Sequence, residues 1–455
     1  MLIKFLPREL RKYFLMSKRQ RKYEIALSLW YKPLLYVALA IAAAIITIFI
    51  DTQFNLPLRY TLFSYDFETT RTLMSTLIAS ILLLSAFTLN ILLVFLSTLS
   101  GQFSPRMLQD FIATKEIQHF VGVFNGGFIY VLLMLLFINN FQQEVFFLVP
   151  LLTVLMIFVN AIIFLFFINH AIHWMLVYNI TWSMRTISED IIQKTLAEDM
   201  EKLKVEEAGD LKVEFQQHLK VVQAPAAGYI QLVDFQGIVR MAQKDDIIIK
   251  LDGRIGDFIL AGNLLFSYWG PGTEKVNEEA YKKFFSFGNK ELEIQDNYAA
   301  MSKLAEVAIK SINNGDPLSA INVIYQLANL MQSIDEHITF TPYLADSDKQ
   351  VRMITREQYF EDSLYRGFGV IRYYAKGDIP IIIEIVSALR MLAHSSKPIR
   401  YKDIWCFAEN TVENISKDII YDIDRTLLLK KLNQLAITTG YESRYEKIQE
   451  AIKRK

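Results

Sequence analysis

Polar side chains recur within residues 72–105, a stretch of 34 residues without an acidic or basic side chain. If this stretch is a helix, successive side chains are rotated by about 100°, and five polar residues then fall near one face. The five are Thr76, Ser80, Asn90, Ser97 and Thr98. Hydroxyl and amide groups can line a path for ions without any charged side chain. These five residues are therefore our candidates for the lining of a pore.

The same face also carries large apolar residues, namely Leu83, Phe87 and Val94. A second interpretation is therefore that the polar groups hydrogen-bond between packed helices, as they commonly do in membranes. Four helices of one chain leave little room for water, so a pore would require several copies of the chain. Both interpretations stay open from the sequence alone.

A turn with a basic residue directly follows the polar stretch. It contains Gln102, Ser104, Pro105 and Arg106. Proline disfavours helical backbone in the residue before it, so the turn is expected to end the helix. Arg106 can pair with a lipid phosphate or with an acidic residue of a later domain. We interpret the four residues as a candidate coupling loop, with a turn that only fixes topology as the alternative.

Motifs for catalysis are not found. The chain has no glycine-rich phosphate loop, no His-Glu-x-x-His and no Gly-x-Ser-x-Gly. His170 and His173 have a spacing that could hold a metal, but no carboxylate lies within ten residues of them. Cys406 is the single cysteine, so it cannot form an internal disulfide. We expect no enzyme activity, no catalytic residue, no metal and no cofactor.

Four apolar stretches are long enough to cross a bilayer, which takes about 20 residues of helix. They comprise residues 33–50, a part of 72–105, 120–138 and 145–168. Hydrocarbon cannot hydrogen-bond the backbone, so single crossings must be helical. None of the four contains Asp, Glu, Lys or Arg, which speaks against a proton-coupled transporter. We predict a four-helix transmembrane domain at residues 31–184.

Basic residues predict the orientation of these spans. Eight lie in the first 30 residues: Lys4, Arg8, Arg11, Lys12, Lys18, Arg19, Arg21 and Lys22. The loops between the spans carry two at most, so the N-terminus and, after four crossings, the C-terminal domain are expected in the cytoplasm. Residues 1–30 also contain aromatic and aliphatic side chains. They are either an amphipathic segment on the cell (inner) membrane or a basic tail that only sets topology.

Length and charge limit the functions that are open to the whole chain. It has 455 residues, of which 52% are hydrophobic, and equal numbers of basic and acidic residues. No domain is strongly basic, so we expect no nucleic-acid partner. The expected partners are the lipid bilayer, further copies of the chain and, for a channel, ions.

A change of pattern follows a charged helical connector at residues 185–215. Short apolar runs broken by glycines predict a small β-barrel or sandwich at residues 216–270. Residues 224–230 resemble the opening of a biotinyl/lipoyl-type barrel, and residues 256–265 resemble its closing pattern. The turn that carries the modified lysine in that architecture is missing here. The resemblance implies a shape and no cofactor.

Helical periodicity dominates residues 271–455. Asp316 precedes Pro317 and is the better of two candidate N-caps for a helix there, the other being Ser319. Further helices are expected at residues 359–375, 381–393 and 405–434. The predicted fold class is thus an α-helical membrane protein with a cytoplasmic α+β domain.

The residues 100–108, Ser-Gly-Gln-Phe-Ser-Pro-Arg-Met-Leu, resemble the loop after the second span in a widespread prokaryotic family. That family is described as a predicted membrane protein of unknown function. Four later features resemble its continuation: Gly122-Val123-Phe124 with Gly127, His170, residues 224–229 with 256–258, and Asp316-Pro317 with Ala320. Gly315 departs from the asparagine that is usual there. The resemblance covers residues 30–334 and implies four spans and a soluble domain, without an activity.

Two functions are compatible with these features. The first is an oligomeric ion channel, or channel-like permeation protein, regulated by its cytoplasmic domain. The alternative is a membrane scaffold or sensor that transports nothing and binds a partner through that domain. A ring of copies with a hydrated axis would favour the first, and a monomer or dimer with lipid-filled interfaces the second.

Overall fold

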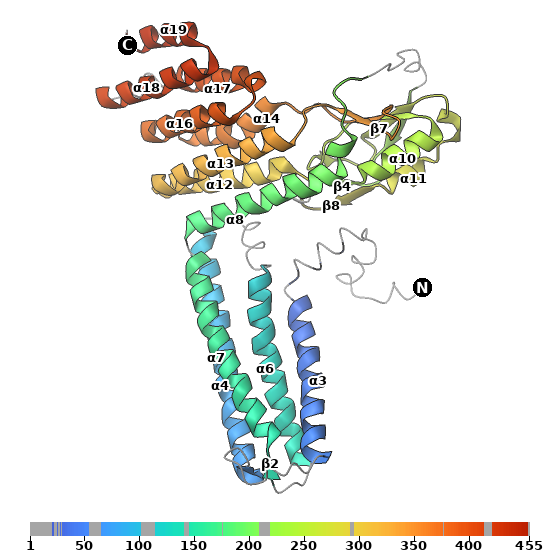
Figure 1. Ribbon diagram of the computed structural model, residues 1–455, viewed down its shortest axis with the longest axis vertical. Helices are drawn as coiled ribbons and strands as arrows, with labels where there is room; N and C mark the ends of the chain where they lie inside the picture. Colours follow the sequence, from blue (N-terminus) through green and yellow to red (C-terminus); the bar gives the residue numbers. More distant parts are fainter. Residues whose placement is uncertain are drawn as a thin grey trace. The chain divides into compact units, whose positions relative to one another are not determined.

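The structure is a computed structural model of the chain. It describes residues 21, 25, 28, 30–53, 65–101, 114–140, 145–174, 176–208, 219–291, 295–375, 377–413 and 421–453. The chain divides into an N-terminal unit, Met1–Leu176, and a C-terminal unit, Val177–Lys455. The expected boundary at residues 184 and 185 lies further on, inside helix α8 of the C-terminal unit (Figure 1).

Four long helices stand out among the described residues of the N-terminal unit: α3 (Tyr31–Gln53), α4 (Phe67–Ser100), α6 (Lys115–Asn140) and α7 (Leu148–Trp174). Each is long and apolar enough to cross a membrane, which confirms the prediction of four spans. Two short strands, β1 (Tyr65–Asp66) and β2 (Val145–Phe146), pair antiparallel and join the start of α4 to the start of α7. The α6 helix contacts all three of the others.

Helix α4 buries one narrow stripe. Met74, Ile81, Thr88 and Phe95 follow one another at intervals of seven residues, and each is at most 3% exposed. A helix has about 3.6 residues per turn, so residues seven apart lie almost above one another. The stripe therefore packs on the neighbouring helices, and the opposite side of α4 points away from the bundle.

Small residues let α6 approach its neighbours closely. A Cβ atom on Gly122 would lie 2.4 Å from the ring of Tyr36, and one on Gly127 would lie 2.3 Å from the Nδ2 atom of Asn160. Glycine at such crossings permits the close contact of backbones that drives helix association in membranes. The glycines of the third span thus have a packing role in the bundle.

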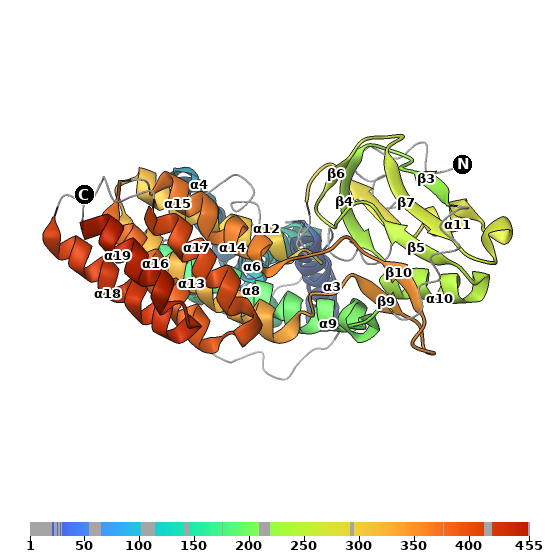
Figure 2. The same cartoon turned by 90° about the horizontal axis from the view of Figure 1, so that it is seen from above.

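The C-terminal unit opens with a helical connector: α8 (Val177–Asp190), a π-helical segment η2 (Ile191–Leu196), α9 (Ala197–Asp199) and η3 (Glu201–Leu203). It runs along the C-terminal unit, from the helical region of that unit toward its sheets (Figure 2). Arg185 in α8 is buried and forms an ion pair of 2.7 Å with Glu189, and Thr181 bonds Asn322 at 3.3 Å. The ion pair lies within α8, whereas the bond to Asn322 joins this first connector helix to the following helical region.

Two sheets follow the connector. The five-stranded sheet has the order β3 (Lys220–Gln223), β7 (Leu264–Trp269), β5 (Ile248–Leu251), β10 (Val351–Ile354), β9 (Tyr343–Ala345). The three-stranded sheet has the order β6 (Phe258–Ile259), β4 (Gly228–Val233), β8 (Phe285–Gly288). The helix α10 (Phe235–Asp245) and the sheets share one apolar core. The short helix α11 (Glu278–Lys282) precedes β8.

The two fragments that resemble a biotinyl/lipoyl-type barrel lie side by side. Gly228 and Tyr229 of β4 pair with Ile259 and Phe258 of β6. The N–H of Ala224 donates to the Asn263 carbonyl at 2.8 Å.

The β region differs from the expected segment 216–270, because β8, β9 and β10 lie beyond it, in the region expected to be mainly helical. β10 joins β5 in parallel, with Met353 opposite Ile249. Strands of three or four residues carry too little periodicity to be recognised from sequence. The expected division at residues 270 and 271 therefore does not separate sheet from helices.

The remaining helices form a bundle at the other end of the unit (Figure 2). They are α12 (Asn297–Asn313), α13 (Pro317–His337), α14 (Phe360–Leu364), η6 (Tyr365–Gly369), α15 (Val370–Tyr374), α16 (Ile379–Ser395), α17 (Tyr401–Glu413), α18 (Asp422–Thr439) and α19 (Glu442–Lys453). Asp316 is the N-cap of α13, as predicted, and accepts a bond from the Ser319 N–H at 3.1 Å. The helix expected at 405–434 is two helices, α17 and α18. The α+β class of the C-terminal region is confirmed.

Candidate functional site

The five candidate pore residues all lie on the exposed side of α4. We call Thr76, Ser80, Asn90, Ser97 and Thr98 the outward face of α4. The buried stripe occupies the opposite side of the helix, so none of the five points into the bundle of one chain. Any path that they line must form between copies of the chain.

Three hydroxyl groups on the outward face, those of Thr76, Ser80 and Thr98, are satisfied by their own helix. Thr76 donates to the Thr72 carbonyl at 2.9 Å, and Thr98 donates to the Val94 carbonyl at 3.0 Å. Ser80 donates to the carbonyl of Thr76 at 3.1 Å. Such back-bonding lets serine and threonine face hydrocarbon at low cost. Asn90 differs, because a side-chain amide offers two donors and one acceptor, more than its own helix can satisfy.

The coupling-loop candidates Gln102, Ser104, Pro105 and Arg106 lie outside the residues that the structure describes. The same holds for the basic residues before Arg21. The description of α4 ends at Gly101, which follows the last helical residue, Ser100.

Polar groups also occur inside the bundle. The Tyr130 hydroxyl donates to Thr47 at 3.2 Å, and the Asn160 amide donates to the Met156 carbonyl at 2.8 Å. Near one end of the bundle His119 meets both the amine of Lys32 at 3.0 Å and the hydroxyl of Tyr36 at 2.8 Å. The bonds of Tyr130 and His119 join α3 to α6, whereas that of Asn160 lies within α7. The first set supports the role of polar groups in helix packing.

His170 packs against aromatic rings. Its ring centroid lies 5.6 Å from that of Phe120 and 6.0 Å from that of Trp174. Among the described residues no group of three His, Cys, Asp or Glu side chains has the geometry of a metal site.

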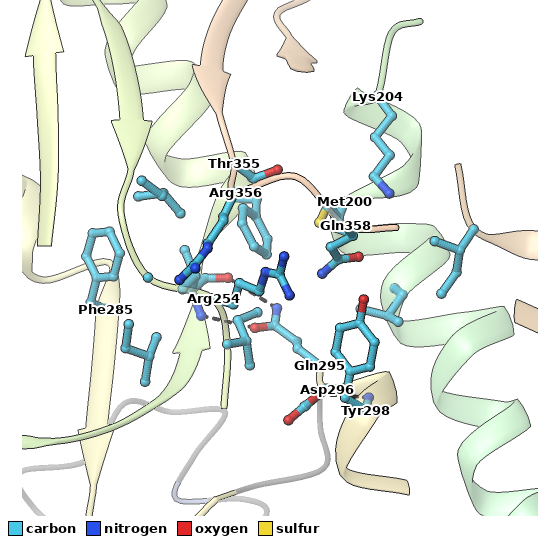
Figure 3. Close-up of a pocket in the computed structure, with 18 of the residues that line it drawn as sticks. Met200, Lys204, Arg254, Phe285, Gln295, Asp296, Tyr298, Thr355, Arg356 and Gln358 are labelled. Atoms are coloured by element: carbon cyan, nitrogen blue, oxygen red, sulfur yellow. Dashed lines mark hydrogen bonds between the residues drawn. The ribbon is translucent and has the colours of Figure 1, made fainter. Parts of the chain in front are cut away.

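A second candidate site, which the sequence did not indicate, is a cavity of about 40 Å³ in the C-terminal unit. Its wall combines both sheets, the connector, the start of α12 and the stretch 338–358. Much of the lining is apolar, including Leu251, Phe285 and Met200. Figure 3 shows the Arg254 guanidinium, the Tyr298 hydroxyl and the Gln358 amide extending toward the same space.

Three cationic side chains line the cavity, and each has an acidic neighbour that is not part of the lining. Arg254 Nη1 lies 3.2 Å from Asp362, and its Nη2 donates to the Glu357 carbonyl. Lys204 lies 2.6 Å from Glu201, and burial lowers the pKa of its amine. Arg356, 59% exposed at the rim, reaches Asp257 only at 3.8 Å.

Asp296 carries the one carboxylate among the described residues of the lining. It is the N-cap of α12 and accepts a bond from the Tyr298 N–H at 2.9 Å. Burial raises its pKa to about 7, against the lowering effect of its backbone hydrogen bonds. Its other oxygen lies against Gly256, where φ is +88° and a Cβ would come within 2.3 Å of it. A glycine is therefore needed at this position.

Two donors in the cavity have no hydrogen-bond partner among the residues that the structure describes. They are the Tyr298 hydroxyl and the Arg254 Nε–H, both buried. The hydroxyl of Ser363 on α14 lies close enough to that of Tyr298 to lower its pKa, but the pair lacks the geometry of a hydrogen bond. Most buried polar groups in proteins are satisfied, so two orphaned donors at one cavity make it a candidate site for an acceptor.

The lining residues come from at least five distant segments, and no single segment has an unusual motif. The Gly256-Asp257 pattern was recognised from the sequence, but Arg254 just before it was not. The available signal for Arg254 was its place in a turn with glycines on both sides, Gly253 and Gly256.

Comparison with known families gives a match over most of the chain: the family described as Predicted membrane protein (DUF2254) matches residues 26–391. This confirms the resemblance of the loop after the second span to a membrane-protein family of unknown function, and the match extends beyond residue 334. No curated protein matches the chain, and no solved structure does either.

Proposed function

The chain belongs to the predicted membrane protein family DUF2254, and from that premise we propose that it forms an oligomeric, channel-like permeation protein. In this proposal copies of the chain meet along the outward face of α4 and enclose a path for ions. The C-terminal unit lies in the cytoplasm and regulates the path. The eight basic residues before residue 30 support this orientation in the cell membrane.

The observation that carries the proposal is the exposure of Asn90 on α4. Asn90 lies ten residues from the end of the helix at Ser100, or about 15 Å along its axis. At that depth an amide in contact with lipid loses its hydrogen bonds to water, which costs several kcal/mol. A neighbouring copy of the chain or a hydrated path supplies the missing bonds.

Symmetry makes several copies the natural source of such a contact. In a closed ring each copy presents the same surface, so the outward faces of α4 repeat around the axis. Ser97 and Thr98 then extend the polar surface toward one end of the helix, and Thr76 and Ser80 toward the other. Phe87 and Val94, which share this side, are 50% and 60% exposed and would form apolar constrictions between the polar levels.

A scaffold or sensor that transports nothing is the second candidate. Three hydroxyls on the outward face bond to their own helix, and the large apolar residues beside them suit contact with lipid. In that case the chain is a monomer or dimer, and the C-terminal unit binds a partner. Neither candidate requires an enzyme activity.

Single-channel recording of the purified protein in planar bilayers tests the proposal. We expect conductance steps whose size falls in Asn90→Leu, because leucine removes the amide at the midpoint of the path. Asn125→Leu is the matched control. Asn125 is also exposed, but it lies on α6 and its amide donates to the Val121 carbonyl at 2.9 Å.

The oligomeric state is measured on the same samples by native mass spectrometry. Silence across several salts and voltages, with a folded protein present in the bilayer, would favour the scaffold or sensor. Equal effects of Asn90→Leu and Asn125→Leu would remove α4 as the lining.

A further inference from the structure

The cavity of the C-terminal unit has an excess of hydrogen-bond donors. The Tyr298 hydroxyl is unpaired although the residue is only 3% exposed, and burial raises its pKa to about 12. It is therefore protonated at neutral pH and can donate. The Arg254 Nε–H is also buried and unpaired. Both donors reach into the same space (Figure 3), where only an acceptor can satisfy them.

The charges of the lining point to an anionic acceptor. Lys204, Arg254 and Arg356 line the cavity, and Asp296 opposes them. Glu201, Asp362 and Asp257 each pair with one of the three cations from outside the lining, which leaves the cationic groups as the charges that face the cavity. The ion pair of Arg356 is the loosest of the three at 3.8 Å, so this guanidinium has donors to spare. Arginine is suited to planar or tetrahedral oxyanions because its N–H groups form a fork.

The size of the cavity limits what can bind. A volume of about 40 Å³ holds roughly three water molecules or one small oxyanion. The space is too small for a nucleotide or for the chains of a lipid. Apolar residues such as Leu251 and Phe285 complete the wall and keep bulk water away, which strengthens any charge-assisted bond inside.

We propose that this cavity binds a free small oxyanion of the phosphate, sulfate or carboxylate class. Arg254 supplies a charge-assisted bond through Nε–H, Tyr298 donates its hydroxyl, and Arg356 closes the rim. Asp296 is the carboxyl group of the lining, and its negative charge when ionised disfavours the anion.

The position of the site gives it a route to regulation. Leu196, Met200 and Lys204 of its wall belong to the connector, which follows the fourth span directly in the sequence. An anion that draws Lys204 toward Arg254 would shift the connector. This regulatory consequence depends on the proposed function, whereas binding itself does not.

Binding is tested on the full-length protein in detergent, without any measurement of conductance. Inorganic phosphate, sulfate and acetate are titrated against chloride at constant ionic strength, with the melting temperature and the heat of binding as readouts. We expect saturable stabilisation by at least one oxyanion. Tyr298→Phe should weaken the affinity about tenfold, the effect of losing one hydrogen bond to a charged group.

Tyr298→Phe removes an unpaired hydroxyl and should leave the fold intact, whereas Arg254→Gln should abolish binding but also loses the pair with Asp362. Tyr445→Phe is the matched control, because Tyr445 is a buried tyrosine in α19 that does not line the cavity. The proposal is overturned if no oxyanion stabilises the protein more than chloride does. It is equally overturned if Tyr298→Phe and Tyr445→Phe bind alike, since the cavity then holds only water.

Discussion

Asp296 is a carboxylic acid that the fold keeps away from water, and its replacement by asparagine should change how stability depends on pH. The pKa of this group rises from an ordinary value of 3.8 to about 7, chiefly because of burial. Below pH 4 the side chain is neutral in both the folded and the unfolded chain. Between pH 4 and pH 7 only the unfolded chain ionises, so the folded state loses stability as the pH rises.

The size of this loss follows from the shift. Each factor of ten in proton affinity corresponds to about 1.4 kcal/mol, so the full penalty above pH 7 is about 4 kcal/mol. An asparagine in place of Asp296 has no proton to release and can still cap α12 through its side-chain carbonyl oxygen. For a domain of this size, 4 kcal/mol corresponds to roughly 10 °C in melting temperature.

The assay compares melting temperatures of wild type and Asp296→Asn from pH 4 to pH 8, in buffers without phosphate or sulfate. The two should be similar at pH 4, and the variant should melt at a higher temperature at pH 8. Asp316→Asn is the matched control, since it makes the same change at the N-cap of α13, where the side chain is partly exposed. Parallel curves for wild type and Asp296→Asn would refute the assignment of a buried, proton-holding carboxyl.

Three further changes test the packing. Asp51→Ala removes a carboxylate that accepts bonds of 3.1–3.3 Å from three N–H groups at the start of α7. The start of α7 should lose about 1 kcal/mol of protection against hydrogen exchange, while the protection of α4 is unchanged. Gly127→Ala should lower the stability of the bundle by about 1–3 kcal/mol, measured by thermal melting, because the added Cβ meets Asn160. Adding Asn160→Ala to this variant should restore part of the lost stability. A double variant as unstable as Gly127→Ala would contradict the proposed clash. Met353→Ala empties a fully buried position in β10 and should lower the free energy of unfolding by about 2–5 kcal/mol. Protection against hydrogen exchange should also fall in β5, the strand paired with β10. Unchanged protection in β5 would contradict the pairing.

The membrane-spanning part of the fold follows from composition. Four apolar runs, each long enough to cross, can only be helices in hydrocarbon, and their expected boundaries lie within about six residues of those in the structure. Rotation by 100° per residue placed five polar residues of α4 near one face, and all five are exposed in the structure. It could not say which side faces the bundle, because Thr88 on the buried stripe is as polar as Thr76 on the outward face.

The C-terminal unit was predictable where the signals are local. Asp316 before Pro317 is a helix start that two adjacent residues define. The cavity was not predictable, because its wall brings together residues from 196 to 358 that the sequence separates widely. The same limit applies to β10, whose four residues acquire their meaning only beside β5.

The parallel pairing of β5 with β10 also sets the order in which the unit is completed. A ribosome reaches Met353 about a hundred residues after Ile249, the residue opposite it in the sheet. At usual rates of synthesis this delay lasts roughly 5–20 s. During that time β5 has β7 on one side and an open edge on the other, and open strand edges recruit strands from other chains. A nascent chain of this protein that stops between α13 and β10 therefore presents an unfinished sheet while its four apolar helices are already made.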